Sequence, residues 1–143
     1  MTLDIRGMAA GDIEDVLALW RATENLGLDE DADTHEGIAA YLERNPGMSL
    51  VACEGETLIG AVLCGTDGRR GYLHHLAVAT THRRQGIGKA LVGACMDALK
   101  RAGIPRCHTF VYVKNQAGLA FWRSIGWQGW EEVGITGMSY NIE

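Results

Sequence analysis

The chain has 143 residues, of which 47% are hydrophobic and 22% are charged, and its net charge is −5 at neutral pH. This length suits one domain with a buried core, and the ordinary composition argues against a disordered or fibrous protein. The acidic balance argues against nucleic acid as the main partner.

Two further exclusions come from apolar runs and cysteines. No apolar run is long enough to span a bilayer, and the N-terminal residues MTLDIRGM lack a basic region followed by an apolar one. We therefore expect a cytoplasmic protein with no membrane partner. Cys53, Cys64, Cys95 and Cys107 are widely spaced and form no CxxC pair, which favours reduced core thiols over disulfides or a metal site.

The first half of the chain alternates between strand and helix periodicity. A carboxylate-rich loop over residues 24–36 separates two helices, the second of which can be capped by Asp33 or Thr34. Three extended runs with tight turns then predict antiparallel strands. The expected elements are a strand at 2–6, helices at 12–22 and about 34–45, and strands at 49–54, 57–64 and 72–79.

The second half continues with a helix whose apolar residues follow one stripe. A Gly-x-Pro stop signal follows this helix, and Asn115 can cap another helix that stops at Gly126. The remaining expected elements are helices at 88–102 and 115–125 and strands at 106–113, 127–133 and 135–142. This order predicts an α/β (α+β) fold, a single domain over residues 1–143, with about seven strands and about four helices.

The stretch from Gly71 to Gly103 is a strand, a turn and a helix in succession. Its turn, RRQGIG, contains two glycines and little side-chain bulk, so successive backbone N–H groups can point at one anion. The helix N-terminus adds roughly half a positive charge, and Arg83, Arg84 and Lys89 add whole charges. The turn therefore predicts a phosphate site.

Two common phosphate-binding motifs do not fit this turn. A P-loop requires Ser or Thr after the lysine, but Ala90 follows Lys89. The Rossmann fingerprint requires GxGxxG, but after Gly86 and Gly88 the next glycine is Gly93, two positions too late.

The pattern R-x-x-G-x-G, preceded by the strand end LAV, resembles motif A of the GNAT superfamily of acetyl-CoA-dependent N-acetyltransferases. The later segment NQAGLAFWRSIGW resembles the second signature of that family, and SLVACEGETLIGAVLCGTDGRRGYLHHLAV resembles small bacterial GNAT proteins of the YpeA type. The resemblance implies the GNAT fold, with a mixed central sheet splayed in its middle, and acetyl transfer to an amine.

The resemblance also implies acetyl-CoA as cosubstrate. Its pyrophosphate would lie on the amides of the turn and its pantetheine along the preceding strand end, where the amide of Val78 would stabilise the oxyanion. Asn115 would contact the pantetheine, or cap its helix, or do both. The implied cofactor-binding residues are Leu76, Ala77, Val78, Arg83, Arg84, Gln85, Gly86, Ile87, Gly88, Lys89, Asn115 and Trp122.

An amine acceptor is mostly protonated at pH 7, so the transfer needs a base. Strand alternation is expected to place Tyr72 and His74 on one face with Leu76 and Val78, and to turn His75 to the other face. The resemblance places the base, or a group that holds a water, at the positions of Tyr72 and His74. We expect His74 to act as the base, directly or through a water, and His75 to be structural.

One position departs from the family. Trp122 stands where the family usually has the tyrosine that protonates the leaving thiolate, and an indole N–H cannot act as an acid at neutral pH. Tyr112, His108 or a water are open alternatives. An acetyl-CoA-binding sensor with little or no catalysis is the competing interpretation of the whole chain.

The sequence gives less information about the acceptor substrate and about the oligomeric state. The resemblance places the loop over residues 24–36 beside the acceptor, where its carboxylates would favour a cationic amine such as a polyamine, a lysine side chain or a peptide N-terminus. Alternatively, these carboxylates belong to a solvated loop. Closing strands of this fold often pair across subunits, which makes a homodimer plausible.

Overall fold

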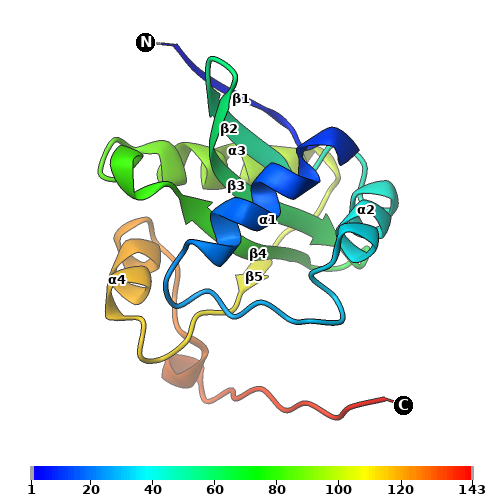
Figure 1. The fold of residues 1–143 in the computed structure, drawn as a ribbon. Helices are drawn as coiled ribbons and strands as arrows, with labels where there is room; N and C mark the ends of the chain where they lie inside the picture. Colours follow the sequence, from blue (N-terminus) through cyan, green and yellow to red (C-terminus); the bar gives the residue numbers. More distant parts are fainter. Residues whose placement is uncertain (1, 143) are drawn as a thin grey trace. The chain divides into compact units, whose positions relative to one another are not determined.

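The computed structural model describes residues 2–142, and this part of the chain contains five strands and four α-helices (Figure 1). The chain divides after Phe110 into two compact units, the second of which contains α4. The bounds are β1 Leu3–Gly7, α1 Ile13–Arg21, α2 His35–Arg44, β2 Leu50–Glu54, β3 Thr57–Thr66, β4 Gly71–Val78, α3 Ile87–Arg101, β5 Cys107–Thr109 and α4 Gln116–Ser124, with short 3-10 helices at Ala10–Asp12, Thr80–His82 and Trp130–Val133.

The first unit is built on one mixed sheet with the strand order β1-β2-β3-β4-β5. Neighbouring strands are antiparallel except for β4 and β5, which run parallel because α3 crosses over between them. Helices α1 and α2 cover one face of the sheet and α3 covers the other (Figure 1). The mixed α/β fold that the sequence predicts is confirmed.

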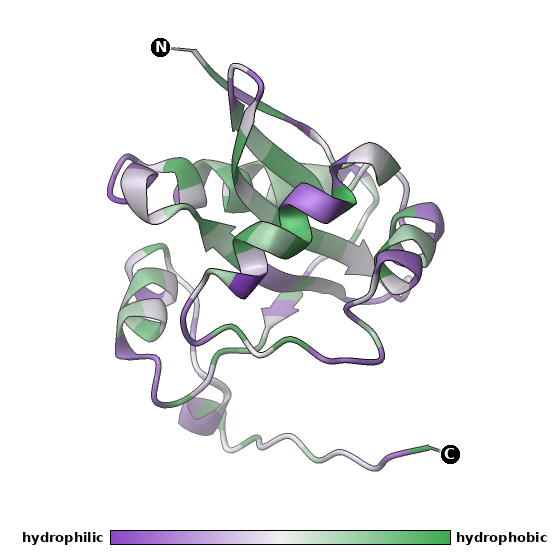
Figure 2. Cartoon of the chain, in the orientation of Figure 1, coloured by the Kyte–Doolittle hydropathy of each residue, from purple (hydrophilic) through white to green (hydrophobic). Residues whose placement is uncertain are grey.

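The face under α1 and α2 is closed by residues at helical spacing. Ile13, Val16, Leu17 and Trp20 of α1 are buried, and the first turn of α2 is capped by Thr34, whose Oγ1 accepts a hydrogen bond of 3.0 Å from the Gly37 amide. Figure 2 shows hydrophobic colouring along the central strands and alternating hydrophobic and hydrophilic bands along α1. The predicted helix periodicity is therefore correct.

The face under α3 is packed closely enough to require glycine in the sheet. A Cβ at Gly71 would lie 2.6 Å from Cδ1 of Leu99, and one at Gly60 would lie 3.1 Å from Cδ1 of Leu91. Leu91, Cys95 and Leu99 are buried at this contact. All four cysteines of the chain are free, and all but Cys107 are buried.

The predicted strand count of about seven is wrong, because neither closing strand forms in the described residues. The range 127–133 ends in a 3-10 helix, and the range 135–142 has no strand. Gly134 takes a φ of +79°, and the Ile135 amide bonds the Trp130 carbonyl at 3.0 Å. Local hydrogen bonds thus replace the cross-strand pairing that the apolar alternation of the tail suggested.

The predicted strand over 106–113 is also shorter than expected, since β5 covers only Cys107–Thr109. No helix within residues 2–142 is long and apolar enough to cross a membrane. Across the same residues, no group of three or more His, Cys, Asp or Glu side chains is arranged to hold a metal ion.

Candidate active site

A β-bulge interrupts β4 next to the predicted base. The register of β3 and β4 shifts between Ala61 and Leu63, so that two residues, His75 and Leu76, lie opposite Val62. His75 has a φ of +57°, in the left-handed region. This conformation costs a non-glycine residue roughly 1–3 kcal/mol and is concentrated at functional sites. A bulge also redirects the side chains on either side of it.

The bulge overturns the predicted alternation of β4. His75 was expected on the face opposite His74, but its ring meets the Trp20 ring of α1 edge-on at 5.0 Å between centroids. The extra residue shifts the period of the strand by one, so both histidines lie under α1 and α2. Beyond the bulge, Val78 pairs with Gly60 on the α3 face, and not on the face of His74 as predicted.

Aromatic side chains enclose the half-buried imidazole of His74. The Phe110 and Tyr72 rings stack on it at 5.8 and 6.4 Å between centroids, and the Tyr41 ring of α2 meets it edge-on at 6.2 Å. No hydrogen bond to the ring nitrogens of His74 is found within residues 2–142. These nitrogens therefore remain available to a substrate or a water.

Burial is the main reason that the pKa of His74 lies below that of a free imidazole. The neighbouring His75 lowers the pKa further, while the carboxylate of Asp33 opposes the shift. A pKa below 6.5 keeps His74 neutral at pH 7, which is the form that accepts a proton.

The edge of β4 is open beside this histidine. Strand β5 pairs only with the first three residues of β4, up to the contact of Thr109 with Leu73. Strand β5 ends at Thr109, and the range 74–78 has no β5 partner among the described residues. This edge of β4 is therefore unpaired, and the splay that the family resemblance implied stays a prediction.

The predicted phosphate turn follows β4 after the 3-10 helix Thr80–His82. Helix α3 begins at Ile87, and Gly86 precedes it with a φ of +80° and no side-chain cap on the helix. The amides of Ile87, Gly88 and Lys89 in the first turn therefore have no acceptor within the helix. A Cβ at Gly86 would meet no atom within 4 Å, so the turn is open. These amides, with the helix dipole behind them, fit a diphosphate.

The basic residues of this turn are not equivalent. Arg84 and Lys89 are exposed, as an anion site requires. Arg83 is also exposed, but its guanidinium already has partners within the chain: its Nε donates to the Val78 carbonyl at 3.1 Å, and its Nη1 lies 2.6 Å from Oε1 of Glu24. Arg83 thus joins the end of β4 to the segment between α1 and α2.

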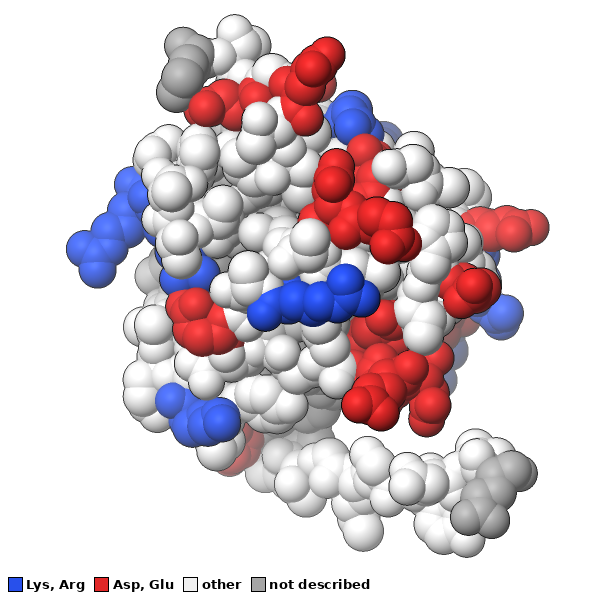
Figure 3. Space-filling view, viewed as in Figure 1, with Lys and Arg blue, Asp and Glu red and all other residues white. Residues whose placement is uncertain are grey.

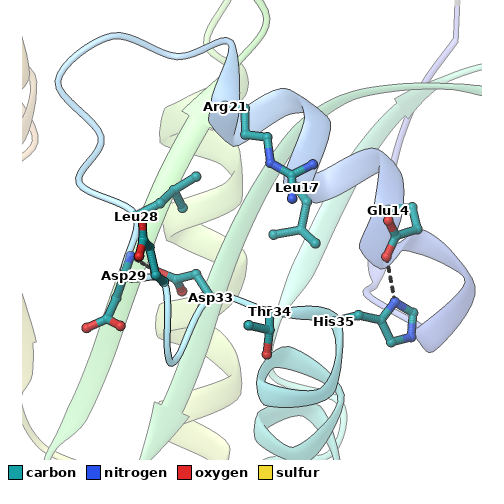
Figure 4. A pocket seen from close by; sticks show the side chains of 9 residues that line it. Glu14, Leu17, Arg21, Leu28, Asp29, Asp33, Thr34 and His35 are labelled. Atoms are coloured by element: carbon teal, nitrogen blue, oxygen red, sulfur yellow. Dashed lines mark hydrogen bonds and ion pairs between the residues drawn. The ribbon is translucent and has the colours of Figure 1, made fainter.

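An open pocket of about 380 Å³ lies between α1, the α1–α2 segment and the start of α2 (Figure 4). Its lining includes four carboxylates, one arginine and one histidine, and the histidine ring is held by Glu14 at 2.7 Å. Acidic side chains gather on this face of the molecule (Figure 3). The charged and ionisable lining residues are Glu14, Arg21, Asp29, Glu30, Asp33 and His35.

Two predicted cofactor contacts lie in the second unit, which is described by itself. Asn115 caps α4, since its Oδ1 accepts a hydrogen bond of 2.9 Å from the Gly118 amide. Trp122 is buried, and its ring lies 4.6 Å from that of Trp127 and 5.3 Å from that of Phe121. The predicted cap is confirmed, and contact of Asn115 with the pantetheine stays a prediction.

Sequence reasoning did not predict the contact of Asp33 with His75. Nε2 of His75 lies 3.0 Å from Oδ2 of Asp33, which sequence reasoning had offered as a helix cap and as one of the carboxylates of the loop over residues 24–36. Trp20 is fully buried, and its indole Nε1 has no hydrogen-bond partner in the part of the chain that the structure describes. The only signal in the sequence was the cluster of carboxylates before α2.

Residues 13–127 match the model of the Acetyltransferase (GNAT) family, so the chain belongs to this family. The match spans residues of both units. The chain is an N-acetyltransferase of the GNAT family, and acetyl-CoA is its cosubstrate.

Individual proteins agree with this assignment. An acetyltransferase from Pectobacterium atrosepticum is 29% identical over 126 residues, which is 88% of each chain. The crystal structure of PaiA N-acetyltransferase from Thermoplasma acidophilum, in complex with coenzyme A, has a TM-score of 0.80 at 21% identity, over 90% of this chain and 91% of that chain. Ard1 from Thermoplasma volcanium has a TM-score of 0.78 at 19% identity, over 88% and 82%. These two structures share the fold.

Proposed function

We propose that this acetyltransferase transfers the acetyl group directly to a cationic primary amine, with His74 as the group that accepts the proton of the amine. The observation that carries this proposal is the half-buried His74 imidazole, with no hydrogen-bond partner in the described chain and a lowered pKa, on the open stretch of β4 just before the phosphate turn.

The proton balance explains why a base is needed at this position. An alkyl ammonium titrates near pH 10, so an amine bound at pH 7 must release a proton before its nitrogen can form a bond to carbon. A neutral imidazole accepts that proton, directly or through one water. Tyr72 stacks on the ring at 6.4 Å and would hold it in place. The indole of Trp122 supplies no proton, so the thiol would leave as the thiolate unless another group or a water protonates it.

The cofactor would be held by two stretches of the chain. The amides and exposed cations of the range 84–89 would bind the diphosphate, and the unpaired edge of β4 over the range 76–78 would bind the pantetheine through its backbone. When bound, acetyl-CoA supplies the activated acyl group. Arg83 would contribute by fixing the Val78 carbonyl and so the end of the strand.

The acidic pocket supports a cationic acceptor. Carboxylates outnumber basic groups among its lining residues, and the one histidine there is paired with Glu14. A field of this sign raises the local concentration of polyamines, lysine side chains and peptide N-termini relative to acidic amines.

The test is thiol release with acetyl-CoA and a panel consisting of spermidine, a lysine-containing peptide and a peptide with a free N-terminus, each against an acidic amine as control. The His74→Ala substitution should lower kcat/KM by about 10²–10⁴-fold while calorimetry finds an unchanged affinity for acetyl-CoA. Tight acetyl-CoA binding without turnover on any amine would instead favour a sensor of GNAT fold.

A further inference from the structure

A side-chain contact joins the segment between α1 and α2 to the bulge of β4. Oδ2 of Asp33 lies 3.0 Å from Nε2 of His75, across 42 positions of sequence. The side chains are 9% and 19% exposed respectively, so water competes little for this hydrogen bond.

Each partner is fixed by its own surroundings. The same Oδ2 of Asp33 accepts a hydrogen bond of 2.7 Å from the Asp29 amide, and the Asp33 amide donates to the Asp29 carbonyl at 2.9 Å. The carboxylate is therefore part of a closed turn. His75 is fixed by the left-handed backbone of the bulge and by the edge of the Trp20 ring. A hydrogen bond between two such groups fixes the segment relative to the strand.

The contact lies beside the proposed base. The rings of His75 and His74 are 6.3 Å apart between centroids, and Asp33 also lines the acidic pocket. We propose that Asp33 and His75 are a positioning pair for the acetyl transfer, whose hydrogen bond holds the α1–α2 segment against β4 and so sets where the acceptor amine meets His74. The proposal rests on the proposed function of His74, and neither residue of the pair touches the reacting atoms.

Substitution can separate the hydrogen-bond donor of His75 from the effect of its imidazole on the pKa of His74. His75→Gln keeps an N–H donor near the position of Nε2 but removes the imidazole that lowers the pKa of His74, whereas His75→Leu removes both the donor and the imidazole. The titratable groups that face His74 are Tyr41 from α2, Tyr72 and His75 from β4, and Asp33 from the α1–α2 segment. The effect of removing His75 on the pKa of His74 should therefore be visible in both variants.

The first measurement is amide hydrogen exchange in the free protein, which needs no acceptor. In His75→Leu, the amides of the range 29–33 should exchange at least about tenfold faster, because the segment is released from β4. In His75→Gln, they should stay within about threefold of the wild type. If the leucine variant does not fold, His75→Ala replaces it, since alanine also lacks the donor. Unchanged exchange without the donor would overturn the proposal.

The second measurement is steady-state kinetics with spermidine, or with whichever amine of the panel has the highest kcat/KM. His75→Leu should raise the KM for the amine about tenfold and leave the KM for acetyl-CoA within about twofold, whereas His75→Gln should leave both near the wild type. In both variants, the acid limb of kcat/KM should move to higher pH, because His75 is one of the groups that lower the pKa of His74. Asp31→Ala is the matched control, since this exposed carboxylate lies in the same segment and makes no side-chain hydrogen bond to β4 in the described chain.

The two proposals fail in different ways. Equal rises in amine KM for the Gln and Leu variants, with no change in the acid limb, would indicate a merely structural histidine and overturn the positioning pair. A wild type that turns over no amine would overturn the proposed function. Turnover is expected to be lost in His74→Ala. If it is lost, but neither the amide exchange of the range 29–33 nor the KM for the amine depends on the donor at position 75, only this inference is overturned.

Discussion

The two faces of the central sheet are closed by different chemistry. Under α3, the sheet meets Leu91, Cys95 and Leu99, which are at most 2% exposed, and the sheet residues Cys64 and Leu73 opposite them are fully buried. Under α1 and α2, an apolar cluster is followed along β4 by half-buried aromatic and imidazole rings and by a segment rich in carboxylates. The first face supplies stability, whereas the second holds the groups that can exchange protons with a substrate.

The strongest test of this comparison concerns the turn that joins β4 to α3. We expect the double substitution Gly86→Val and Gly88→Val to lower the affinity for coenzyme A by about 100-fold or more, since a β-branched residue at a φ of +80° must displace the amides that we propose to bind phosphate. Titration calorimetry measures the affinity. Gly93→Val in the same helix is the control, because a Cβ there meets no atom within 4 Å, and equal losses in both proteins would contradict the assignment of the turn.

The second test examines the face under α1 and α2 through the pH dependence of kcat/KM. The pKa of His74 is lowered by burial, so the neutral base is present at pH 7 and is lost as the pH falls through that pKa. We expect kcat/KM to be flat near pH 7 and to fall about tenfold per pH unit below an apparent pKa lower than 6.5.

The control for this profile is His74→Gln, whose residual activity should lack the acid limb. An acid limb that persists unchanged in this variant would assign the titration to another group. A wild-type midpoint above 6.5 would contradict the effect of burial on this imidazole.

The third test addresses the α3 face. Leu99→Ala should destabilise the protein by about 2–5 kcal/mol, because it empties a buried site against Gly71. Urea unfolding measures this loss, and kcat/KM of the folded variant at 25 °C should stay within about twofold of the wild type. A drop in kcat/KM as large as that of a His74 variant would show that the two faces are not separate in function.

Short segments were the predictable part of this molecule. The turn with Gly86, the cap by Asn115 and the stripe of α3 depend on neighbours within a few residues, and all three are present as predicted. The bulge at His75 and its contact with Asp33 could not be predicted, because strand alternation assumes a regular pleat and the two partners are 42 residues apart.

The tail shows the opposite error, an expected element that does not form. Met138, Tyr140 and Ile142 alternate with polar residues as a strand would, yet each is more than 90% exposed. A period of two describes which side chains can share a face, but a strand also requires a neighbour for its backbone, and no short pattern identifies that neighbour.

The smallest expected effect concerns an ion pair at the rim of the α1 face. Arg6 binds Asp12 through two hydrogen bonds of 2.8 and 2.9 Å, and the Ala9 amide donates to the same carboxylate at 2.8 Å. The bond from Arg6 is the main reason that the pKa of Asp12 lies below 3.8. Asp12→Asn should therefore lower the free energy of unfolding at pH 7 by about 1 kcal/mol, since the partner is partly exposed.

The pH dependence of that difference separates the ion pair from simple packing. A carboxylate with a lowered pKa stabilises the folded protein fully above its unfolded value, near pH 4, and this contribution disappears as the pH falls through the folded value. The difference in the free energy of unfolding between wild type and Asp12→Asn, measured with urea, should be constant from pH 5 to pH 7 and should shrink below about pH 4. If this difference stays constant below pH 4 as well, the Asp12 side chain acts through packing. Even the rim of this face would then be closed in the same way as the face under α3.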